Sequence, residues 1–513
     1  MRATLQQGRL PRHVLTFERE VERGGALPPH YVVDILLRMF GRLVGRGVPL
    51  AVLGMLAVAL TAGPSQAAGE QITDVLVRGN SRTNESTVRS IAGISIGDIL
   101  AADTLDMVRE RLGTSGLFSD VNVWWEPHGP GLRINISVRD KFPWAPIPTG
   151  SWSSNNKSIG LIFVHGNLLG RGKQLLVGGR LATIDSGVVA AYRDPSLFGT
   201  WIYWQLQGLL QRQVIPEYQN YGTTPNGGAI RLAIPVEFRE TRLFSYGVEP
   251  ALGVAWFRRV KTQIAWHLEK FEYFDHGSDD PNMHPPSVQL IQATARGAIG
   301  VGRAALTFDY RAREFALMSG GALDAFFDYA GSLLGSDFTY WRAGLGWQQG
   351  IKLFRAHNLI YGAGTTIGHD LPFWAENTAG GSNLRGYLEQ QFRGDTQVWG
   401  NAEYHFPLFS IRSLDFRALA FYDVQAIWFR SLPTTNKVGP DAGGTSYYQR
   451  DTPDARTFPT MLRAGFSFDQ SVHSDVGAGL RFFLRSVAVP LVGVDAGYGI
   501  EARNWQLLVV VGV

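Results

Sequence analysis

The sequence predicts an all-β transmembrane barrel preceded by one small α+β domain. Three observations predict this fold class. Apolar and polar residues alternate along many segments after residue 144, glycine (60 residues) and aromatic side chains (12%) are abundant, and a single segment is apolar over a long run. Alternation with a period of two, interrupted by turn residues, is typical of strands with one apolar and one polar face.

Composition argues against several classes of function. The formal net charge is +4 over 513 residues, which does not favour nucleic-acid binding, and the absence of cysteine removes disulfides, thiolate metal sites and a cysteine nucleophile. The nearest approach to a phosphate loop has Asn167 in place of its first glycine and Gln174 in place of Ser/Thr. We therefore expect a protein that is not an enzyme and that holds no metal and no cofactor.

The apolar run covers residues 48–62. It follows Arg42 and Arg46 and leads into Gly-Pro-Ser-Gln-Ala-Ala at 63–68, which is the order of a secretory signal peptide. A membrane anchor is the alternative, but the run is shorter than the roughly 20 residues that a helical span needs. If the mature chain lies in a membrane, it must therefore be a closed barrel.

The start of the signal peptide is expected at Met39, because residues 1–38 have no signal-like pattern. We expect the signal peptide at 39–67, with cleavage after Ala67 or after Ala68, and we interpret residues 1–38 as a non-native or extended N-terminus.

Residues 70–141 predict the small α+β domain. Its elements are expected at 72–80 (strand), 88–91 (helix after a cap), 101–115 (helix), and 121–125 and 132–138 (a hairpin). Three segments resemble a POTRA domain: Val-Leu-Val-Arg-Gly-Asn at 75–80, Gly97-Asp98, and Gly-Leu-Phe-Ser-Asp-Val at 116–121. The resemblance implies that the domain binds client segments by strand addition at a sheet edge. Another small α+β domain is the alternative.

Residues 144–513 predict the barrel, after a proline-rich linker at 142–148. The alternation is most regular at 202–207, 397–406, 415–428 and 475–485. A soluble β-sandwich would alternate too. However, the apolar faces end in Trp and Tyr and the opposite faces carry Arg, Asp and Glu, as an aromatic girdle and a water-filled lumen would require.

One loop identifies the family that the barrel resembles. Residues 380–387, Gly-Gly-Ser-Asn-Leu-Arg-Gly-Tyr, resemble the Arg-Gly-(Phe/Tyr) loop of the superfamily of barrel assembly and secretion proteins, which includes BamA, TamA and the two-partner secretion transporters and is also called the bacterial surface antigen barrel. Further segments agree in order: 167–173 and 193–199 as turns, 401–408 and 421–423 as the two strands after the loop, and 477–481 as the penultimate strand.

The resemblance implies a barrel of sixteen antiparallel strands, although length alone would also permit twelve or eighteen. It also implies that the loop folds into the lumen and that its arginine, Arg385, meets acidic residues of the wall. Alternation places Glu403 and Asp423 on the inward face. We expect a loop lock formed by Arg385, Gly386, Tyr387, Glu403 and Asp423. A solvated Arg385 is the alternative.

The resemblance implies a bacterial outer-membrane protein whose POTRA domain lies in the periplasm. We expect an assembly or insertion factor for outer-membrane proteins, with a translocator of a secreted protein as the alternative; a passive porin would not need the POTRA domain. The expected partners are unfolded outer-membrane or secreted clients and membrane lipids. Accessory subunits are not predicted, because the chain has one POTRA domain where other members of the superfamily have several.

Overall fold

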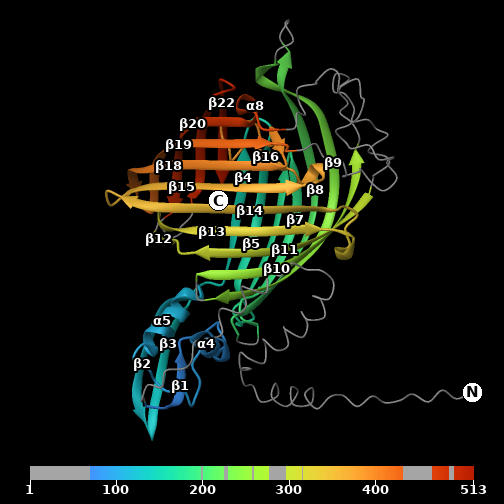
Figure 1. The fold of residues 1–513 in the computed structure, drawn as a ribbon. Helices are drawn as coiled ribbons and strands as arrows, with labels where there is room; N and C mark the ends of the chain where they lie inside the picture. The colour runs from blue at the N-terminus through green and yellow to red at the C-terminus, as the bar shows by residue number, and fades with distance from the viewer. Residues whose placement is uncertain are drawn as a thin grey trace, which may run out of the picture. The chain divides into compact units, whose positions relative to one another are not determined.

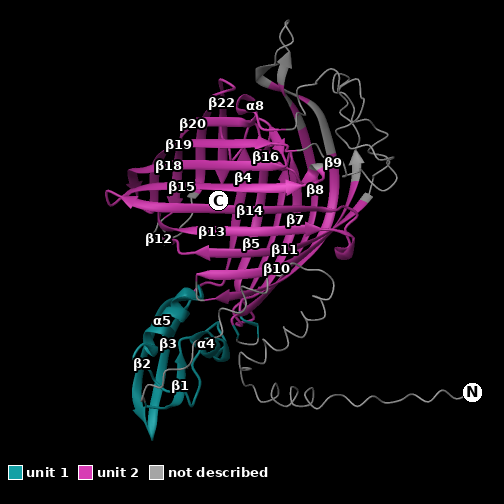
Figure 2. Ribbon diagram, viewed as in Figure 1, with its two compact units in different colours: residues 1–140, 196–200 teal, residues 141–195, 201–513 magenta. Residues whose placement is uncertain are grey.

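The computed structural model describes residues 70–512 with the exception of 198–199, 224–228, 257–258, 276–295, 315, 431–464 and 485–489. The expected N-terminal extension at 1–38 and the signal peptide at 39–67 lie outside the described residues. The chain divides into two compact units, residues 1–140 with 196–200 and residues 141–195 with 201–513 (Figure 2).

The first unit is a three-stranded sheet with two helices. Its elements are β1 (Ile72–Arg78), α4 (Glu85–Ala92), α5 (Thr104–Thr114), β2 (Phe118–His128) and β3 (Gly131–Asp140) (Figure 1). The sheet order is β1-β3-β2, with β1 parallel and β2 antiparallel to the central β3. The observed order of strand, helix, helix, strand, strand is the predicted one. Strand β2 begins three residues earlier than expected and carries an irregularity between Phe118 and Asp120.

The apolar residues of this unit form one core between the sheet and the helices. Its fully buried members include Ile72, Val88, Leu112 and Ile134. The alternation of the strands and the 3.6-residue period of the helices both direct these side chains to the same layer. Burial of this cluster is therefore the main source of stability that the unit has on its own.

We expect Ile134→Ala to destabilise this unit by about 2–5 kcal/mol, because the substitution leaves a cavity in a packed core. Pulse proteolysis of the full chain in urea should show a lower midpoint for cleavage within residues 70–140. Ile96→Ala is the matched control, since Ile96 is 61% exposed. Equal shifts for the two variants would contradict this account of the core.

In the described part of the chain, the second unit is a closed antiparallel barrel of sixteen strands, the number that the family resemblance implies. Its strands are β4 (Trp144–Trp152), β5 (Lys157–Leu168), β6 (Lys173–Ala182), β7 (Asp185–Asp194), β8 (Ile202–Thr223), β9 (Ala229–Trp256), β10 (Val260–Asp275), β11 (Arg296–Asp309), β13 (Leu317–Ala330), β14 (Tyr340–Leu353), β15 (His357–His369), β18 (Thr396–Ile411), β19 (Leu414–Trp428), β20 (Val472–Leu484), β21 (Pro490–Gly499) and β22 (Asn504–Val511). The shorter elements are β12 (Ala312–Glu314), η2 (Ser332–Leu334), η3 (Phe373–Ala375), β16 (Asn377–Ala379), β17 (Phe392–Gly394) and α8 (Phe468–Ser471).

The predicted alternation sets the two faces of the wall. On β18, Gln397 is 8% exposed and its neighbour Val398 is 44% exposed. On β19, Asp423 is buried and Tyr422 is exposed on the outside. Several inward residues of these strands are buried because the loop at 380–391 contacts them from the lumen. No helix in the described part of the chain is long and apolar enough to cross a membrane.

Two expectations about the barrel were wrong. The segment 477–481 lies on β20, the third strand from the end rather than the penultimate one, because β21 and β22 follow it as two separate short strands. The segment 142–148 is not wholly a linker, because β4 begins at Trp144 and pairs with β5 along its whole length. Its prolines are compatible with a strand because their nitrogens do not face β5.

One hydrogen bond next to β4 shows which of its residues direct their backbone N–H and C=O groups toward β5. Gly166 N donates to Pro143 O (2.7 Å), in line with the register that pairs Trp144 with His165. In an antiparallel pair, hydrogen-bonded positions alternate. Odd-numbered residues of β4 therefore bond to β5, and the even-numbered ones, Pro146 and Pro148 among them, direct their backbone groups toward β22.

The barrel closes where β22 meets β4, and this seam is short. The register between these two described strands covers three residue pairs, Val509–Trp152, Val510–Ser151 and Val511–Gly150. Both strands pair along most or all of their length with their other neighbours. In this register Val511 is paired with Gly150 and Val509 with Trp152, so residues 144–149 of β4 lie beyond the end of β22, and residues 504–508 of β22 lie beyond the end of β4.

Candidate functional site

Residues 380–391, called the luminal loop from here on, form a compact turn structure between β16 and β17. Gly381 N donates to Tyr387 O (3.1 Å), and Gly380 N donates to the side chain of Asn383 (3.0 Å). Gly380 has φ +121°, and a Cβ there would lie 1.9 Å from Leu388 O. Glycine is therefore required at this position, and the loop has one tight conformation.

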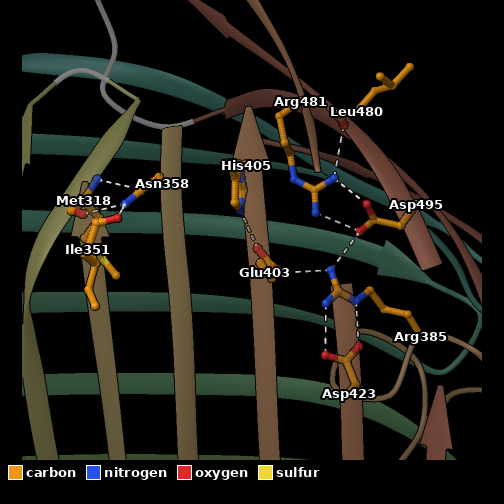
Figure 3. Close-up of polar contacts among 10 residues, drawn as sticks. All are labelled: Met318, Ile351, Asn358, Arg385, Glu403, His405, Asp423, Leu480, Arg481 and Asp495. Atoms are coloured by element: carbon orange, nitrogen blue, oxygen red, sulfur yellow. Dashed lines mark hydrogen bonds and ion pairs between the residues drawn. The ribbon is translucent and has the colours of Figure 1, made fainter. Parts of the chain in front are cut away.

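Arg385 points from this loop to the inward faces of β18 and β19 (Figure 3). Its Nε and Nη2 donate to the two oxygens of Asp423 (2.8 and 3.0 Å), and its Nη1 donates to Glu403 Oε1 (2.6 Å). Arg385 is 6% exposed, so it is not a solvated loop residue. The structure thus contains both ion pairs that the sequence predicts, with the bidentate geometry for which arginine is suited.

The guanidinium also contacts two groups that the sequence did not single out. It lies 3.5 Å from the centre of the Phe421 ring, and its Nη1 is 3.6 Å from Asp495 Oδ2. Burial lowers the pKa of Arg385, but the hydrogen bond to Asp423 and the charges of the surrounding carboxylates outweigh burial and raise this pKa above its usual value. Arg385 therefore remains charged in the lumen.

The carboxylates around Arg385 have further partners. Asp495 on β21 forms a bidentate pair with Arg481 on β20 (2.6 and 2.8 Å), and Glu403 is bonded to His405 (2.8 Å; Figure 3). Four neighbouring strands, β18 to β21, are thus linked through the network of one loop residue. Such a connected network satisfies its buried charges, which would be costly if left alone.

Gly386 and Tyr387 fix the rest of the motif to the wall. Gly386 N donates to Asp475 Oδ2 (2.7 Å), and a Cβ on Gly386 would lie 2.5 Å from Gly499 N. The Tyr387 hydroxyl donates to Ser474 O (3.3 Å) and is also hydrogen-bonded to the Glu501 carboxylate. Glycine at 386 therefore allows close backbone approach, and the tyrosine hydroxyl finds partners in a buried site.

Sequence reasoning missed Asp475 and Asp495 as partners of the loop, and Arg481 as the partner of Asp495. Asp475 and Arg481 alternate onto the inward face of the 475–485 segment, so their orientation was visible. Alternation shows which residues face inward, but it does not show which of them the loop reaches. Asp495 lies on β21, a strand that the sequence analysis did not identify.

Two other family-like segments also meet. In the turn between β5 and β6, Asn167 Oδ1 accepts a hydrogen bond from Gly172 N (2.8 Å). Lys173, at the start of β6, forms an ion pair with Asp194 at the end of β7 (3.0 Å). These contacts explain why the polar residues of both segments occur at the ends of adjacent strands.

A cavity of about 710 Å³ separates the luminal loop from the opposite wall. Arg385, Glu403 and Asp495 line one side. Residues of β5 to β8 form another side, where small and apolar residues accompany the ion pair Arg180–Asp185 and Gln211. Gly150 and Val510, which belong to the seam, line its edge. The cavity therefore reaches from the charged network to the place where the barrel closes.

We expect Arg385→Ala to destabilise the barrel by about 3–5 kcal/mol, because Asp423 and Glu403 would remain buried without their counter-charge. The folded form should be lost at a lower temperature on semi-native gels. Arg385→Lys should restore little, because an ammonium group cannot form the same planar fork. Arg412→Ala, at an exposed turn, is the control; an unchanged transition for Arg385→Ala would refute the structural importance of the pair.

Comparison with known proteins agrees with this architecture. A family model of the Omp85 superfamily domain matches residues 167–484. Among solved structures, the chain is similar to BamA from Haemophilus ducreyi lacking POTRA domains 1-3 (14% identity, TM-score 0.56, covering 86% of this chain and 84% of that chain). It is also similar to CdiB from Acinetobacter baumannii (12% identity, TM-score 0.53, covering 86% and 73%). The sequence matches no curated protein.

At these identities the two solved structures establish a shared fold and no more. The family model is independent of them, and the residues that it matches extend from the turn between β5 and β6 to the end of β20. Because this match covers more than half of the chain and includes the luminal loop with its wall strands β18 to β20, the protein is a member of the Omp85 superfamily, whose barrels are outer-membrane proteins.

Proposed function

We propose that the protein is an outer-membrane assembly factor that inserts unfolded barrel proteins by adding their strands at the seam. The observation that carries this proposal is the short register between β22 and β4. Beyond the three paired positions the two strands do not overlap, and in the described structure the edges of residues 144–149 of β4 and 504–508 of β22 have no strand register on this side, so their backbone groups could pair with a new strand. Such edges are templates for strand addition.

The relative cost of two movements supports assembly over translocation. Opening the seam breaks a few backbone hydrogen bonds, each worth on the order of 1 kcal/mol in net terms in water. Passing a chain through the lumen requires displacement of the luminal loop, and breaking a buried ion pair such as Arg385–Asp423 costs about 3–5 kcal/mol. The seam is therefore the easier place to open.

The N-terminal unit supplies the capture step in this proposal, as a POTRA domain in the periplasm. Its outer edge at β1 is partly occupied: Ile72 N donates to Asp98 O (2.8 Å), and Arg89 donates to Val75 O (2.6 Å). The other edge strand, β2, also has one occupied carbonyl, since Arg109 donates to Val123 O (3.1 Å), but it carries the exposed Trp124 and Trp125. We therefore assign client binding to β2, where an extended segment could add as a strand beside two large apolar side chains.

The remaining assignments belong to the same proposal. The exposed apolar side chains on the outside of the barrel would contact lipid, as in other transmembrane barrels. The protein would act by binding and templating, without catalysis and without a cofactor. Its clients would be unfolded outer-membrane proteins, and insertion would need no chemical step.

The alternative is a translocator for a secreted protein. The luminal cavity of about 710 Å³ favours it, because a passing chain needs space inside the barrel. In this alternative the luminal loop, rather than the seam, would have to move.

Depletion of the protein followed by an inventory of outer-membrane and secreted proteins tests the two functions. Assembly predicts the loss of many barrel proteins, whereas translocation predicts the loss of one secreted protein. Complementation with the double variant Ser151→Cys/Val510→Cys refines the test. The two new cysteines lie opposite each other across the seam, and the chain has no other cysteine with which they could form a disulfide. We expect the oxidised variant to fail and the reduced one to restore assembly. Full activity with the seam cross-linked would exclude insertion at the seam.

A further inference from the structure

The luminal loop is attached to the N-terminal strands of the barrel as well as to the C-terminal ones. Asn156 Nδ2 donates to Glu389 Oε2 (2.6 Å), Asn155 Nδ2 donates to Glu389 O (3.0 Å), and Glu389 N donates to Asn155 Oδ1 (3.1 Å). Asn155 and Asn156 lie in the turn between β4 and β5. The loop and this turn are separated by more than 230 residues in the sequence.

A second pair of side chains extends this attachment to β8. Gln391 Nε2 donates to Asn220 Oδ1 (2.9 Å), and Asn220 Nδ2 donates to Gln391 O (3.1 Å). Asn155 also donates to the hydroxyl of Tyr218 on the same strand (2.9 Å). Asn156 is 1% exposed and Gln391 is 6% exposed, so these bonds are shielded from water. The N-terminal side of the barrel therefore holds the loop through a specific set of amide groups.

These two sets of contacts lie on opposite sides of the seam. The turn that contains Asn155 and Asn156 directly follows Trp152, the last β4 residue in the seam register. On the other side, Tyr387 is bonded to Glu501 in the turn that precedes β22. The loop thus connects the turn after β4 with the turn before β22. Next to these turns lie the three residue pairs that make up the register between the described residues of β4 and β22.

We propose that the luminal loop is a strap across the seam, and that its attachment through Glu389 to Asn155 and Asn156 is the part that releases when the seam opens. The two ends of the strap differ in strength. Arg385 is held by carboxylates on several strands, whereas Glu389 is held by two neutral amides on one short turn. Breaking a buried pair of charges costs more than breaking hydrogen bonds between an ion and neutral groups.

The release would leave the rest of the barrel intact. With the Glu389 contacts broken, the turn after β4 loses its tie to the luminal loop and keeps the hydrogen bonds from Asn155 to Tyr218 on β8 and from Ser154 to Gln506 on β22. Fewer contacts then hold β4 to β22, and the two strands separate more readily. Arg385 would still hold the loop to β18 and β19. One strap therefore couples the position of the loop to the state of the seam. This inference deepens the proposed function, because it identifies what controls the opening on which insertion depends.

The test is amide hydrogen–deuterium exchange of the full chain in lipid nanodiscs, without any client. Glu389→Ala should raise the exchange of residues 150–156 and 504–511 by about tenfold, because it removes the hydrogen bond from Asn156 to the Glu389 carboxylate and leaves only the two bonds between Asn155 and the Glu389 backbone. Asn156→Asp should raise it further, since it places a carboxylate against Glu389. Glu389→Gln should lie near the wild type, because its amide oxygen can still accept from Asn156.

Controls separate release of the strap from general instability. Ser382→Ala changes an exposed residue of the same loop and should leave all exchange rates unchanged. Exchange within β18 and β19 should stay at its wild-type rate in Glu389→Ala. Unchanged exchange at the seam in both Glu389→Ala and Asn156→Asp would overturn the proposal, and so would a rise spread evenly over the barrel. Because no client is present, neither result would decide between assembly and translocation.

Discussion

A single buried guanidinium organises the inside of this barrel. Arg385 is 6% exposed, so it needs counter-charges close by. Asp423 and Glu403 meet this need through hydrogen bonds, and Asp495 forms a longer ion pair of 3.6 Å from a third strand. The glycines before and after it allow the loop to approach the wall, and Tyr387 fills the remaining gap. The loop, the inward charges of β18 to β21 and the luminal cavity all follow from this one requirement.

The seam between β22 and β4 is held by few backbone contacts, in contrast to the densely bonded surroundings of Arg385. Most neighbouring strands of the barrel pair over long registers, which makes the wall stable and hard to open. Between β22 and β4 the register is short, because the two strands overlap only over the last residues of each. A short register alone would leave the barrel loosely closed. Side-chain contacts between the luminal loop and the turn after β4 compensate for this, and side-chain contacts can be released without unfolding a strand.

The N-terminal unit has a separate core and separate edges. Its central strand β3 has a neighbouring strand on each side, while the edge strand β2 carries two exposed tryptophans. Edge strands with exposed apolar side chains are a hazard unless they have a partner. In the proposed function a client strand is added to an incomplete sheet twice. It is added first at the β2 edge, during capture, and then at the seam, during insertion.

The sequence by itself determined the class of the fold and much of the site. A two-residue period specifies which side chains face the lumen, so Glu403 and Asp423 were assigned to the inward face correctly, and the loop motif located Arg385. Tertiary structure alone decided which inward carboxylates the loop reaches, that Glu389 meets Asn155 and Asn156, and how many residues close the barrel. Even the parity of Pro146 and Pro148 on β4 was hidden, because the segment looked like a linker. The physical reason is that strand alternation is a local property, whereas closure brings together residues more than two hundred positions apart, and no local pattern encodes their register.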